Sequence, residues 1–281
     1  MFVSSANTQP LIFPYQENRM IKNPVIKTML NRKSIRRYTE EIPSDEVLET
    51  IVRAGQQAPF ASQLGSLLLS RDPEKNKFNA PLLFTICVDV HKWELIMAQR
   101  NWKMVASDLK LLLLGMQDAA LMAENMVIAA ESLGMGSCFL GNAPYRSSQI
   151  IKDYNLPSRV FPMVQLSMGY PAENPPPRPR YPLEFVLFED NYPDFSEDLI
   201  REAMTQMDEG YLAQDYYRVG KAMIPLSIDR EETFTLEDYS WTEHICRKWG
   251  QAFLGHNLLA QFKKCGFNIE ERAKQTPSET E

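Results

Sequence analysis

Apolar residues at helical spacing predict two helices near the start of the chain. Asn23-Pro24 has the pattern of a helix cap followed by a first-turn proline, so we expect a helix from there to about Leu30. Ser44 is the expected cap of a second helix, because acidic residues follow it and the next apolar positions form one stripe. The residues between the two helices, 32–38, are β-branched, aromatic and basic, and we expect them to be extended.

Two continuous apolar runs, 81–89 and 162–169, have the length of strands buried on both faces. Between them, residues 105–133 are expected to form one long helix. Its second half is apolar nearly all round, which is typical of a helix in a core or a subunit interface. Gly134 is the expected end of this helix. Strands separated by helices predict a three-layer architecture, of either the α/β or the α+β class.

The composition changes after about residue 190, where charged residues and tyrosines become more frequent and strand patterns end. We therefore expect an N-terminal arm at 1–22, an α+β domain at 23–190 and a mostly helical C-terminal extension at 191–281. Within the extension, helices are predicted at 196–221 and 241–265.

The charge and cysteine content exclude several classes of protein. The 281 residues carry a net charge of -6, which argues against general nucleic-acid binding. None of the four cysteines form a CxxC pair, so reduced thiols and a cytoplasmic location are expected. The longest apolar run, 111–114, predicts no membrane span, and the N-terminus lacks the pattern of a signal peptide. The three histidines lack metal-ligand spacing, and neither a nucleophile elbow nor a P-loop is present.

The segment from Arg32 to Tyr38 carries the most specific chemistry. In an extended segment, side chains alternate between two faces, so Arg32, Ser34 and Arg36 share one face with Tyr38. Two guanidinium groups flanking a hydroxyl suit an oxyanion, since arginine offers charge-assisted, bidentate donors. The alternative is a solvated basic patch on the surface.

Two further segments are candidates for ligand contact. Arg178 and Arg180 lie in a proline-rich stretch that holds the backbone extended, and they are either a second cationic element or surface residues of a linker. The glycine-rich stretch 134–142 follows a helix and lacks the third glycine of a dinucleotide loop, so we interpret it as a turn into a buried strand. Gly141 in this stretch would allow the backbone to approach a ligand ring closely.

The order of these motifs resembles that of the FMN-dependent nitroreductase family over residues 22–190. Residues 32–38, Arg-Lys-Ser-Ile-Arg-Arg-Tyr, match the opening signature of the family, and Ala58-Pro59 matches the start of its flavin-pocket loop. The long helix followed by Gly-x-Gly-Ser-Cys, then Gly-Tyr-Pro at 169–171 and Arg-Pro-Arg at 178–180, resembles the rest of the family pattern.

The resemblance implies an α+β fold, a three-layer α/β/α sandwich. It also implies a homodimer that binds two FMN molecules at its interface. NAD(P)H would reduce the flavin, which would then reduce a nitroaromatic, a quinone or a related electron-poor acceptor. If the matching positions have the roles that they have in the family, Arg32 and Ser34 would bind the phosphate or ribityl chain. Arg36 would lie near N1 and O2 of the ring. The loop at 60–63 would come from the other subunit, and no catalytic side chain is assigned. The expected cofactor-binding residues are Arg32, Lys33, Ser34, Arg36, Phe60, Ala61, Ser62, Gln63, Leu140, Gly141, Asn142, Arg178 and Arg180.

The chain departs from the family pattern in two places. The flavin-pocket loop at 59–67 is atypical, since Phe60 replaces the usual serine, Gln63 the usual asparagine, and Gly-Ser-Leu the usual Gln-Pro-Trp. The C-terminal extension is long for the family. These departures leave two alternatives open: a reductive dehalogenase or flavin-consuming branch of the family, and a flavin-binding sensor or partner-binding protein.

Overall fold

The computed structural model describes residues 21–227, 230–251 and 257–269, and the chain divides into two compact units. We call residues 24–175 with 255–281 the sheet unit, and residues 1–23 with 176–254 the helical unit. Each unit is described by itself. The predicted N-terminal arm lies almost entirely outside the described residues. The predicted segment boundaries at 22/23 and 190/191 stay a prediction.

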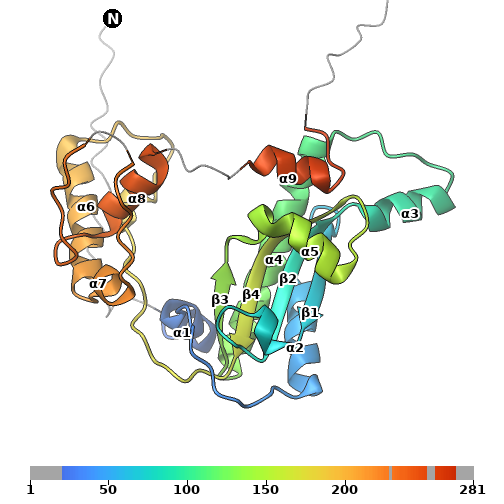
Figure 1. Cartoon of the computed structure of the whole chain (residues 1–281), viewed down its shortest axis with the longest axis horizontal. Helices are drawn as coiled ribbons and strands as arrows, with labels where there is room; N and C mark the ends of the chain where they lie inside the picture. Colours follow the sequence, from blue (N-terminus) through green and yellow to red (C-terminus); the bar gives the residue numbers. More distant parts are fainter. Residues whose placement is uncertain (1–20, 228–229, 252–256, 270–281) are drawn as a thin grey trace, which may run out of the picture. The chain divides into compact units, whose positions relative to one another are not determined.

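The sheet unit contains a four-stranded antiparallel sheet with the strand order β1-β2-β4-β3 (Figure 1). The strands are β1 (Gly65–Ser70), β2 (Leu82–Asp89), β3 (Gly136–Leu140) and β4 (Val160–Gly169). The central strand β2 is buried from Leu82 to Val88, because both of its faces are covered. The strands predicted at 81–89 and 162–169 are thus confirmed, whereas β1 was not predicted.

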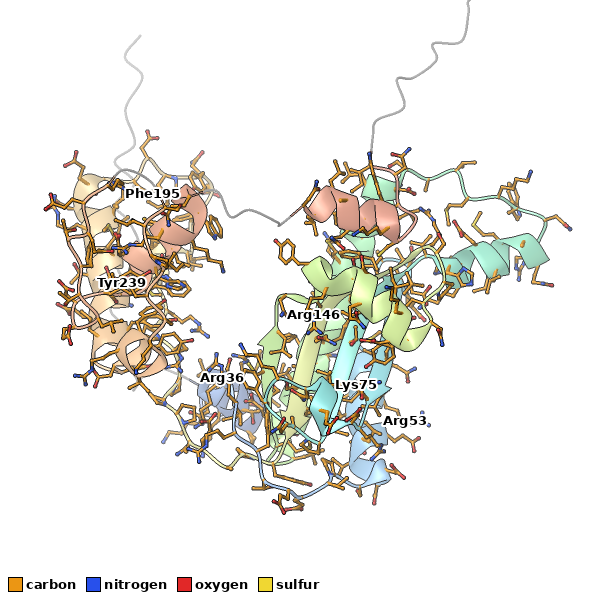
Figure 2. All side chains as sticks on the ribbon, in the orientation of Figure 1. Arg36, Arg53, Lys75, Arg146, Phe195 and Tyr239 are labelled. Atoms are coloured by element: carbon orange, nitrogen blue, oxygen red, sulfur yellow. The ribbon has the colours of Figure 1, made fainter. Side chains whose placement is uncertain are left out.

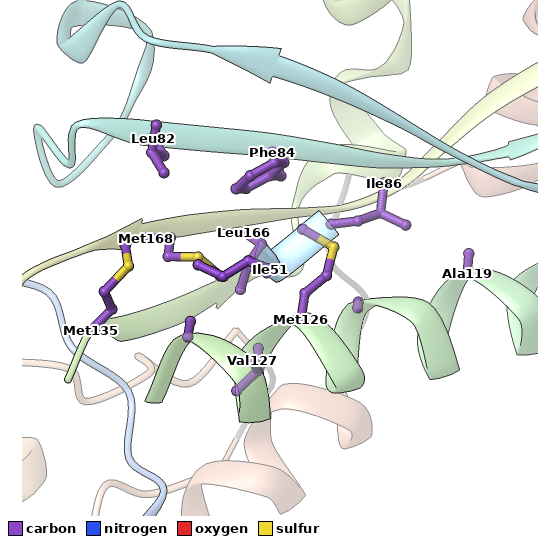
Figure 3. Close-up of a cluster of buried hydrophobic side chains, with 12 residues drawn as sticks. Ile51, Leu82, Phe84, Ile86, Ala119, Met126, Val127, Met135, Leu166 and Met168 are labelled. Atoms are coloured by element: carbon purple, nitrogen blue, oxygen red, sulfur yellow. The ribbon is translucent and has the colours of Figure 1, made fainter. Parts of the chain in front are cut away.

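Helix α4 (Asp108–Ser132) lies along one face of the sheet, with α2 (Asp45–Gln56) packed beside it. The Ser44 side chain accepts a hydrogen bond from the backbone N–H of Val47 at 3.3 Å, which confirms it as the cap of α2. Gly134 follows α4 with φ of 78°, a left-handed conformation that glycine adopts without strain. The side chains between α4 and the sheet form the main core (Figure 3): Ile51, Leu82, Phe84, Ile86, Ala119, Ala123, Met126, Val127, Ala130, Met135, Leu166 and Met168.

The opposite face of the sheet is more polar and is covered by short elements. Gln165 donates a hydrogen bond to Thr85 at 3.0 Å, and Ser167 donates one to Asn76 at 2.9 Å. Asn76 directly follows the turn η2 (Pro73–Lys75), which neighbours α5 (Ser147–Tyr154). Helix layers on both sides of the sheet agree with the predicted α+β sandwich.

The basic segment 32–38 runs extended along the β3 edge of the sheet, as predicted. Ser34 forms a parallel bridge with Ser137, and Tyr38 forms an antiparallel bridge with Pro171. The backbone N–H of Ile35 donates to the carbonyl of Ser137 at 2.8 Å. The segment follows α1 (Pro24–Asn31), the helix predicted from Asn23-Pro24.

Three more elements complete the sheet unit: α3 (His91–Gln99), η3 (Ala143–Arg146) and α9 (Leu258–Lys264). Helix α9 packs Phe262 against Phe161 of β4, with ring centroids 4.5 Å apart. Neither α3 nor α5 was predicted from the sequence.

The helical unit consists of η4 (Leu183–Phe185), α6 (Glu197–Leu212), α7 (Tyr216–Gly220) and α8 (Trp241–Gly250). The prediction of one helix at 196–221 was wrong, because Asp215 takes a left-handed conformation with φ of 49° and separates α6 from α7. The prediction of one helix at 241–265 was also wrong. Gln251 is extended and its side chain bonds the backbone of Ser227, so α8 ends there and α9 belongs to the sheet unit.

Candidate functional site

The side chains of Arg32, Ser34 and Arg36 gather around the thiol of Cys138 on β3. Burial raises the pKa of this thiol, and the positive charge of Arg36, a hydrogen bond with Ser34 and the charge of Arg32 oppose that effect. We call Arg32, Ser34 and Arg36 the basic row. Its members are three of the four side chains that strand alternation placed on one face, the fourth being Tyr38.

Residues that follow the Gly-Tyr-Pro motif hold the basic row in place. The Glu173 carboxylate accepts hydrogen bonds from the backbone N–H of Arg36 at 2.5 Å and of Arg37 at 3.1 Å. The ammonium group of Lys33 donates a hydrogen bond to the side-chain oxygen of Asn174. The motif at 32–38 and the motif at 169–171, far apart in the sequence, therefore meet at one corner of the sheet.

Tyr38 supports the same corner of the sheet. Its hydroxyl donates to the carbonyl of Ile35 at 2.6 Å, and burial raises the pKa of this hydroxyl well above its ordinary value. A tyrosine in this environment stays protonated and acts as a structural hydrogen-bond donor.

Arg32 and Arg36 form no ion pair within the described ranges. Several other arginines do: Arg53, Arg71, Arg159, Arg201, Arg218 and Arg247. Arg32 instead lies over the Phe139 ring, 5.9 Å from its centroid. Two guanidinium groups that form no ion pair, together with a hydroxyl, make a donor set that fits a phosphate or another oxyanion. The residues present therefore fit the phosphate end of FMN.

Leu140, Gly141 and Asn142 lie where β3 ends and η3 begins. Leu140 is half-buried, and a methyl group added at Gly141 would meet no atom within 4 Å. The backbone here thus faces open space on the same strand as Cys138, so a planar ligand can approach it closely.

The loop at 60–63 is held by a residue that sequence reasoning missed, Asp118 of α4. Its buried carboxylate accepts hydrogen bonds from three backbone N–H groups, those of Ala61 at 2.6 Å, Ser62 at 3.1 Å and Leu64 at 2.9 Å. Phe60 stays 55% exposed at the tip of the loop. The available signal was an acidic residue within an apolar helix, which is seldom buried unless it has partners.

Gln63 in this loop has φ of 51°, a left-handed conformation. The indole N–H of Trp93 donates to the carbonyl of Ser62 at 2.7 Å and fixes the loop from α3. The atypical sequence of this loop therefore still forms an ordered turn with defined hydrogen bonds.

The basic row and the loop at 60–63 lie at opposite edges of the sheet. The row follows β3, and the loop leads directly into β1. Three strand spacings separate these edges, about 14 Å at the usual spacing between strands. Within one chain, the structure does not bring these two predicted parts of the site together.

Arg178 and Arg180 belong to the helical unit. Arg178 donates to the side-chain oxygen of Gln214 at 2.5 Å, and its guanidinium lies 4.1 Å from the centroid of the Tyr216 ring. Arg180 donates to the backbone carbonyls of Arg178 and Pro179 at 3.0 and 2.9 Å. Neither has a carboxylate partner within the described residues, and their role at the phosphate stays a prediction.

Glu131, in the last turn of α4, is a second residue that sequence reasoning missed. Burial raises its pKa to about 7, although the positive charges of Arg32 and Lys33 lower it. One of its carboxylate oxygens is buried without a hydrogen-bond partner among the described residues. A carboxyl group that titrates near neutral pH thus lies beside the basic row.

Comparison with known proteins agrees with this geometry. The model of the family described as "Nitroreductase family" matches residues 29–71 and 69–170. The chain is 30% identical to "FMN reductase (NADPH)" of Bacillus subtilis over 70% of this chain and 84% of that protein. It is 29% identical to "Oxygen-insensitive NADPH nitroreductase" of Salmonella typhimurium over 68% of this chain and 84% of that protein.

The structure is also similar to that of NfrA2 from B. megaterium, with a TM-score of 0.76 and 26% identity. This similarity covers 89% of the present chain and 100% of NfrA2, so it extends beyond residue 190 into the C-terminal extension. The match to the family model, the similarity to the two enzymes and this structural similarity all agree. The chain belongs to the nitroreductase family.

Proposed function

We propose that this protein is an FMN-dependent oxidoreductase that uses NAD(P)H to reduce nitroaromatic, quinone or related electron-poor acceptors. The observation that carries the proposal is the basic row, which lies in the part of the chain that the family model matches, surrounds the Cys138 thiol with positive charge and forms no ion pair in the described part of the chain. The named activities of the relatives, reduction of FMN and of nitro compounds with NADPH, support the same reaction class.

The basic row has two roles in this reaction. Arg32 and Ser34 bind the phosphate or the ribityl chain, with Lys33 beside them. Arg36 would bind beside the flavin ring, where a cation would stabilise negative charge on the reduced flavin. Bound FMN supplies the hydride chemistry, so the protein contributes binding, orientation and electrostatics.

The backbone at Leu140, Gly141 and Asn142 would contact an edge of the bound flavin ring. The open space beside Gly141 supports this placement, since no protein atom competes for it within 4 Å. From the family pattern alone, we also propose Arg178 and Arg180 as ligands of the phosphate.

A homodimer follows from the position of the loop at 60–63. The loop and the basic row of one chain lie at opposite edges of the sheet, so the loop that reaches a flavin at the row comes from a second copy. Helices α1 and α4 also expose apolar side chains that such a copy would cover: Met29, Leu30, Leu109, Leu113 and Leu121.

Helix α4 is long and apolar enough to span a bilayer by composition alone. Its buried face packs on the sheet, and we assign its exposed apolar face to the dimer interface. A cytoplasmic location fits the cysteines, because Cys87, Cys138, Cys246 and Cys265 are all free thiols.

The flavin spectrum of the purified chain tests the proposed function. We expect bound FMN, reduction of that flavin by NADPH or NADH without oxygen, and reoxidation by a quinone or a nitroaromatic compound. Arg36→Met should weaken FMN binding at least tenfold, whereas Arg53→Met, which removes an arginine paired with Glu49 on α2, should not. A chain that neither carries flavin nor binds added FMN would contradict the proposal.

The dimer is tested by sedimentation velocity. Leu121→Glu places a charge on the exposed apolar face of α4 and should convert the dimer to monomers with weaker FMN binding. Val219→Glu is the matched control, since Val219 is 78% exposed in the helical unit. A wild-type chain that sediments as a monomer with bound FMN would disprove the shared site.

A further inference from the structure

Two consecutive residues in the first turn of α3, Lys92 and Trp93, hold the loop that leads into β1. The indole N–H of Trp93 donates to the carbonyl of Ser62 at 2.7 Å. The ammonium group of Lys92 donates to the carbonyl of Gly65 at 2.6 Å and to the hydroxyl of Ser66 at 3.3 Å. We call Lys92 and Trp93 the α3 pair. The pair thus binds backbone carbonyls at two places along the loop.

The α3 pair and Asp118 hold opposite kinds of backbone group in this loop. Asp118 of α4 accepts hydrogen bonds from N–H groups of the loop, whereas the α3 pair donates to its carbonyls. Ser62 is bonded in both ways, because its N–H donates to Asp118 and its carbonyl accepts from Trp93. A backbone segment whose donors and acceptors both bind fixed side chains has little freedom to shift. The position of the loop therefore depends on two elements, α3 and α4.

The α3 pair is itself fixed in place. Asp89, the last residue of β2, accepts hydrogen bonds from the backbone N–H of Lys92 at 3.1 Å and from the Ser66 hydroxyl at 2.6 Å. The ring of Trp93 packs against the buried cluster that contains Leu64. The first turn of α3 and the loop thus form one hydrogen-bonded unit that is anchored on the sheet.

The position of this loop matters because of where it lies in the proposed dimer. In Figure 2, Arg36 marks the segment beside β3, at the opposite edge of the sheet from β1 and the loop. In the proposed dimer, the loop of one copy reaches the flavin at the basic row of the other copy. Phe60 at the tip of the loop is 55% exposed. An electron acceptor that lies on that flavin would therefore also contact the loop.

We propose that Lys92 and Trp93 are positioning residues of the reaction, which set the distance between the loop and a quinone or nitroaromatic acceptor on the flavin. They act through the loop and touch neither the flavin nor the acceptor. The inference rests on the proposed function, because it concerns the same site. A small displacement of the loop would lower the affinity for the acceptor, since such contacts depend on distances held to within about 0.5 Å.

Trp93→Phe and Lys92→Met test the inference in the full-length chain with bound FMN. Trp93→Phe keeps an aromatic ring in the buried cluster and removes the N–H donor, and Lys92→Met keeps an unbranched side chain without the ammonium group. The matched controls are Trp249→Phe, at a 79% exposed position on α8, and Lys152→Met, at an exposed position on α5. The measurements are kcat and KM for 1,4-benzoquinone at saturating NADPH or NADH, and the dissociation constant of FMN from flavin fluorescence.

We expect each variant of the α3 pair to raise the KM for the quinone about fivefold, as the loss of one hydrogen bond would, and to keep kcat within twofold of the wild type. A rise in KM alone indicates that binding is lost equally in the ground state and the transition state. The dissociation constant of FMN should change less than threefold, because most of the proposed flavin contacts come from the other edge of the sheet. Lys92→Arg, which keeps a cationic donor, should restore most of the lost affinity, and both controls should match the wild type.

Three results would overturn the inference. If the variants of the α3 pair keep the wild-type KM, the pair only stabilises the fold, while the proposed function stands. If they lose FMN binding and quinone binding to the same extent, the pair supports the whole site and does not set the position of the loop. If the wild-type chain itself binds no FMN, the proposed function fails and the inference fails with it. Thermal unfolding of each variant shows that it is folded at the temperature of the assay.

Discussion

The Asp118 carboxylate lies 2.6 Å from the backbone nitrogen of Ala61, and this contact ties the middle of α4 to the loop that precedes β1. Two more backbone N–H groups, of Ser62 and Leu64, donate to the same carboxylate. Hydrogen bonds to an ionised acceptor are stronger than neutral ones, and a buried carboxylate needs them. The atypical loop therefore keeps its shape through α4 and does not depend on its own sequence alone.

Replacing Asp118 with alanine should destabilise the protein by about 3 kcal/mol, because three N–H groups lose a charged acceptor and some stay buried without a partner. Asp118→Asn should cost less, since one side-chain oxygen remains as an acceptor. Urea unfolding measures both. Asp153→Asn, at an exposed position on α5, should stay within about 0.5 kcal/mol of the wild type. Equal stability of Asp118→Ala and the wild type would show that the loop does not need this anchor.

The sequence predicted best where local rules decide the structure. Ser44 caps α2 because its hydroxyl bonds an N–H three residues away, and β2 follows from one continuous apolar run. The row of Arg32, Ser34 and Arg36 follows from strand alternation alone. Each of these features depends on residues within a few positions of one another.

The features that were missed depend on contacts between distant residues. Asp118 bonds a loop 57 residues earlier in the chain, and Asn76 bonds Ser167 across 91 residues. The opposite placement of the basic row and the loop at 60–63 depends on the strand order, which no local pattern specifies. The atypical residues Gly65 to Leu67 belong to strand β1. The family pattern assigned them to a loop, so no strand was predicted there.

Gly136 and Gly141 should respond differently to alanine. A methyl group at Gly136 would lie 2.4 Å from Cγ1 and 2.9 Å from Cβ of Ile35, so the basic segment must shift away from β3. We expect Gly136→Ala to cost about 2 kcal/mol and to weaken FMN binding, because Ile35 lies between the two ends of the basic row. Urea unfolding and flavin fluorescence measure the two effects.

Gly141→Ala is the contrasting variant, since no atom lies within 4 Å of the added methyl group. Its stability should stay within about 0.5 kcal/mol of the wild type. FMN binding should nevertheless weaken, because the methyl group would occupy space that the flavin ring needs. Unchanged FMN affinity would place the ring away from Gly141.

Glu131 should make the stability of the flavin-free protein depend on pH. Burial raises its pKa from about 4.5 to about 7, so the unfolded chain releases this proton at lower pH than the folded chain does. Stability contributed by the protonated carboxyl is full below pH 4.5 and is lost as the pH rises to 7. Because the side chain is partly exposed, we expect a change of only about 1 kcal/mol.

Glu131→Gln isolates this effect, since the amide has nearly the same shape and does not titrate. The free energy of unfolding of the variant minus that of the wild type should rise between pH 4.5 and pH 7 and then level off. Glu46→Gln, at an exposed position on α2, should show no such rise. A difference that is constant across this pH range would mean that Glu131 titrates normally.

Arg247 should be the main electrostatic anchor of the helical unit. Its side chain is 3% exposed and donates to Glu232 at 2.6 and 2.7 Å, to Glu243 at 2.7 Å and to the carbonyl of Ile224 at 2.9 Å. Removing one partner of a buried ion pair leaves the others without compensation. Arg247→Ala should therefore lower the stability of this unit by about 3 kcal/mol. Arg201→Ala removes an arginine from an exposed pair with Asp198 and should change little.

The same contacts give the helical unit an acid-sensitive region. Hydrogen bonds from Arg247 lower the pKa of Glu232 to about 2, with a further contribution from the backbone N–H of Phe234. Because the folded pKa is depressed, the stabilisation is full above about pH 4.5 and is lost as the pH falls towards 2. Tryptophan fluorescence during acid titration should show the wild type losing stability in this range, whereas Glu232→Gln should start less stable and respond less to acid. Parallel acid titrations of the two proteins would instead mean that Arg247 is held mainly by Glu243.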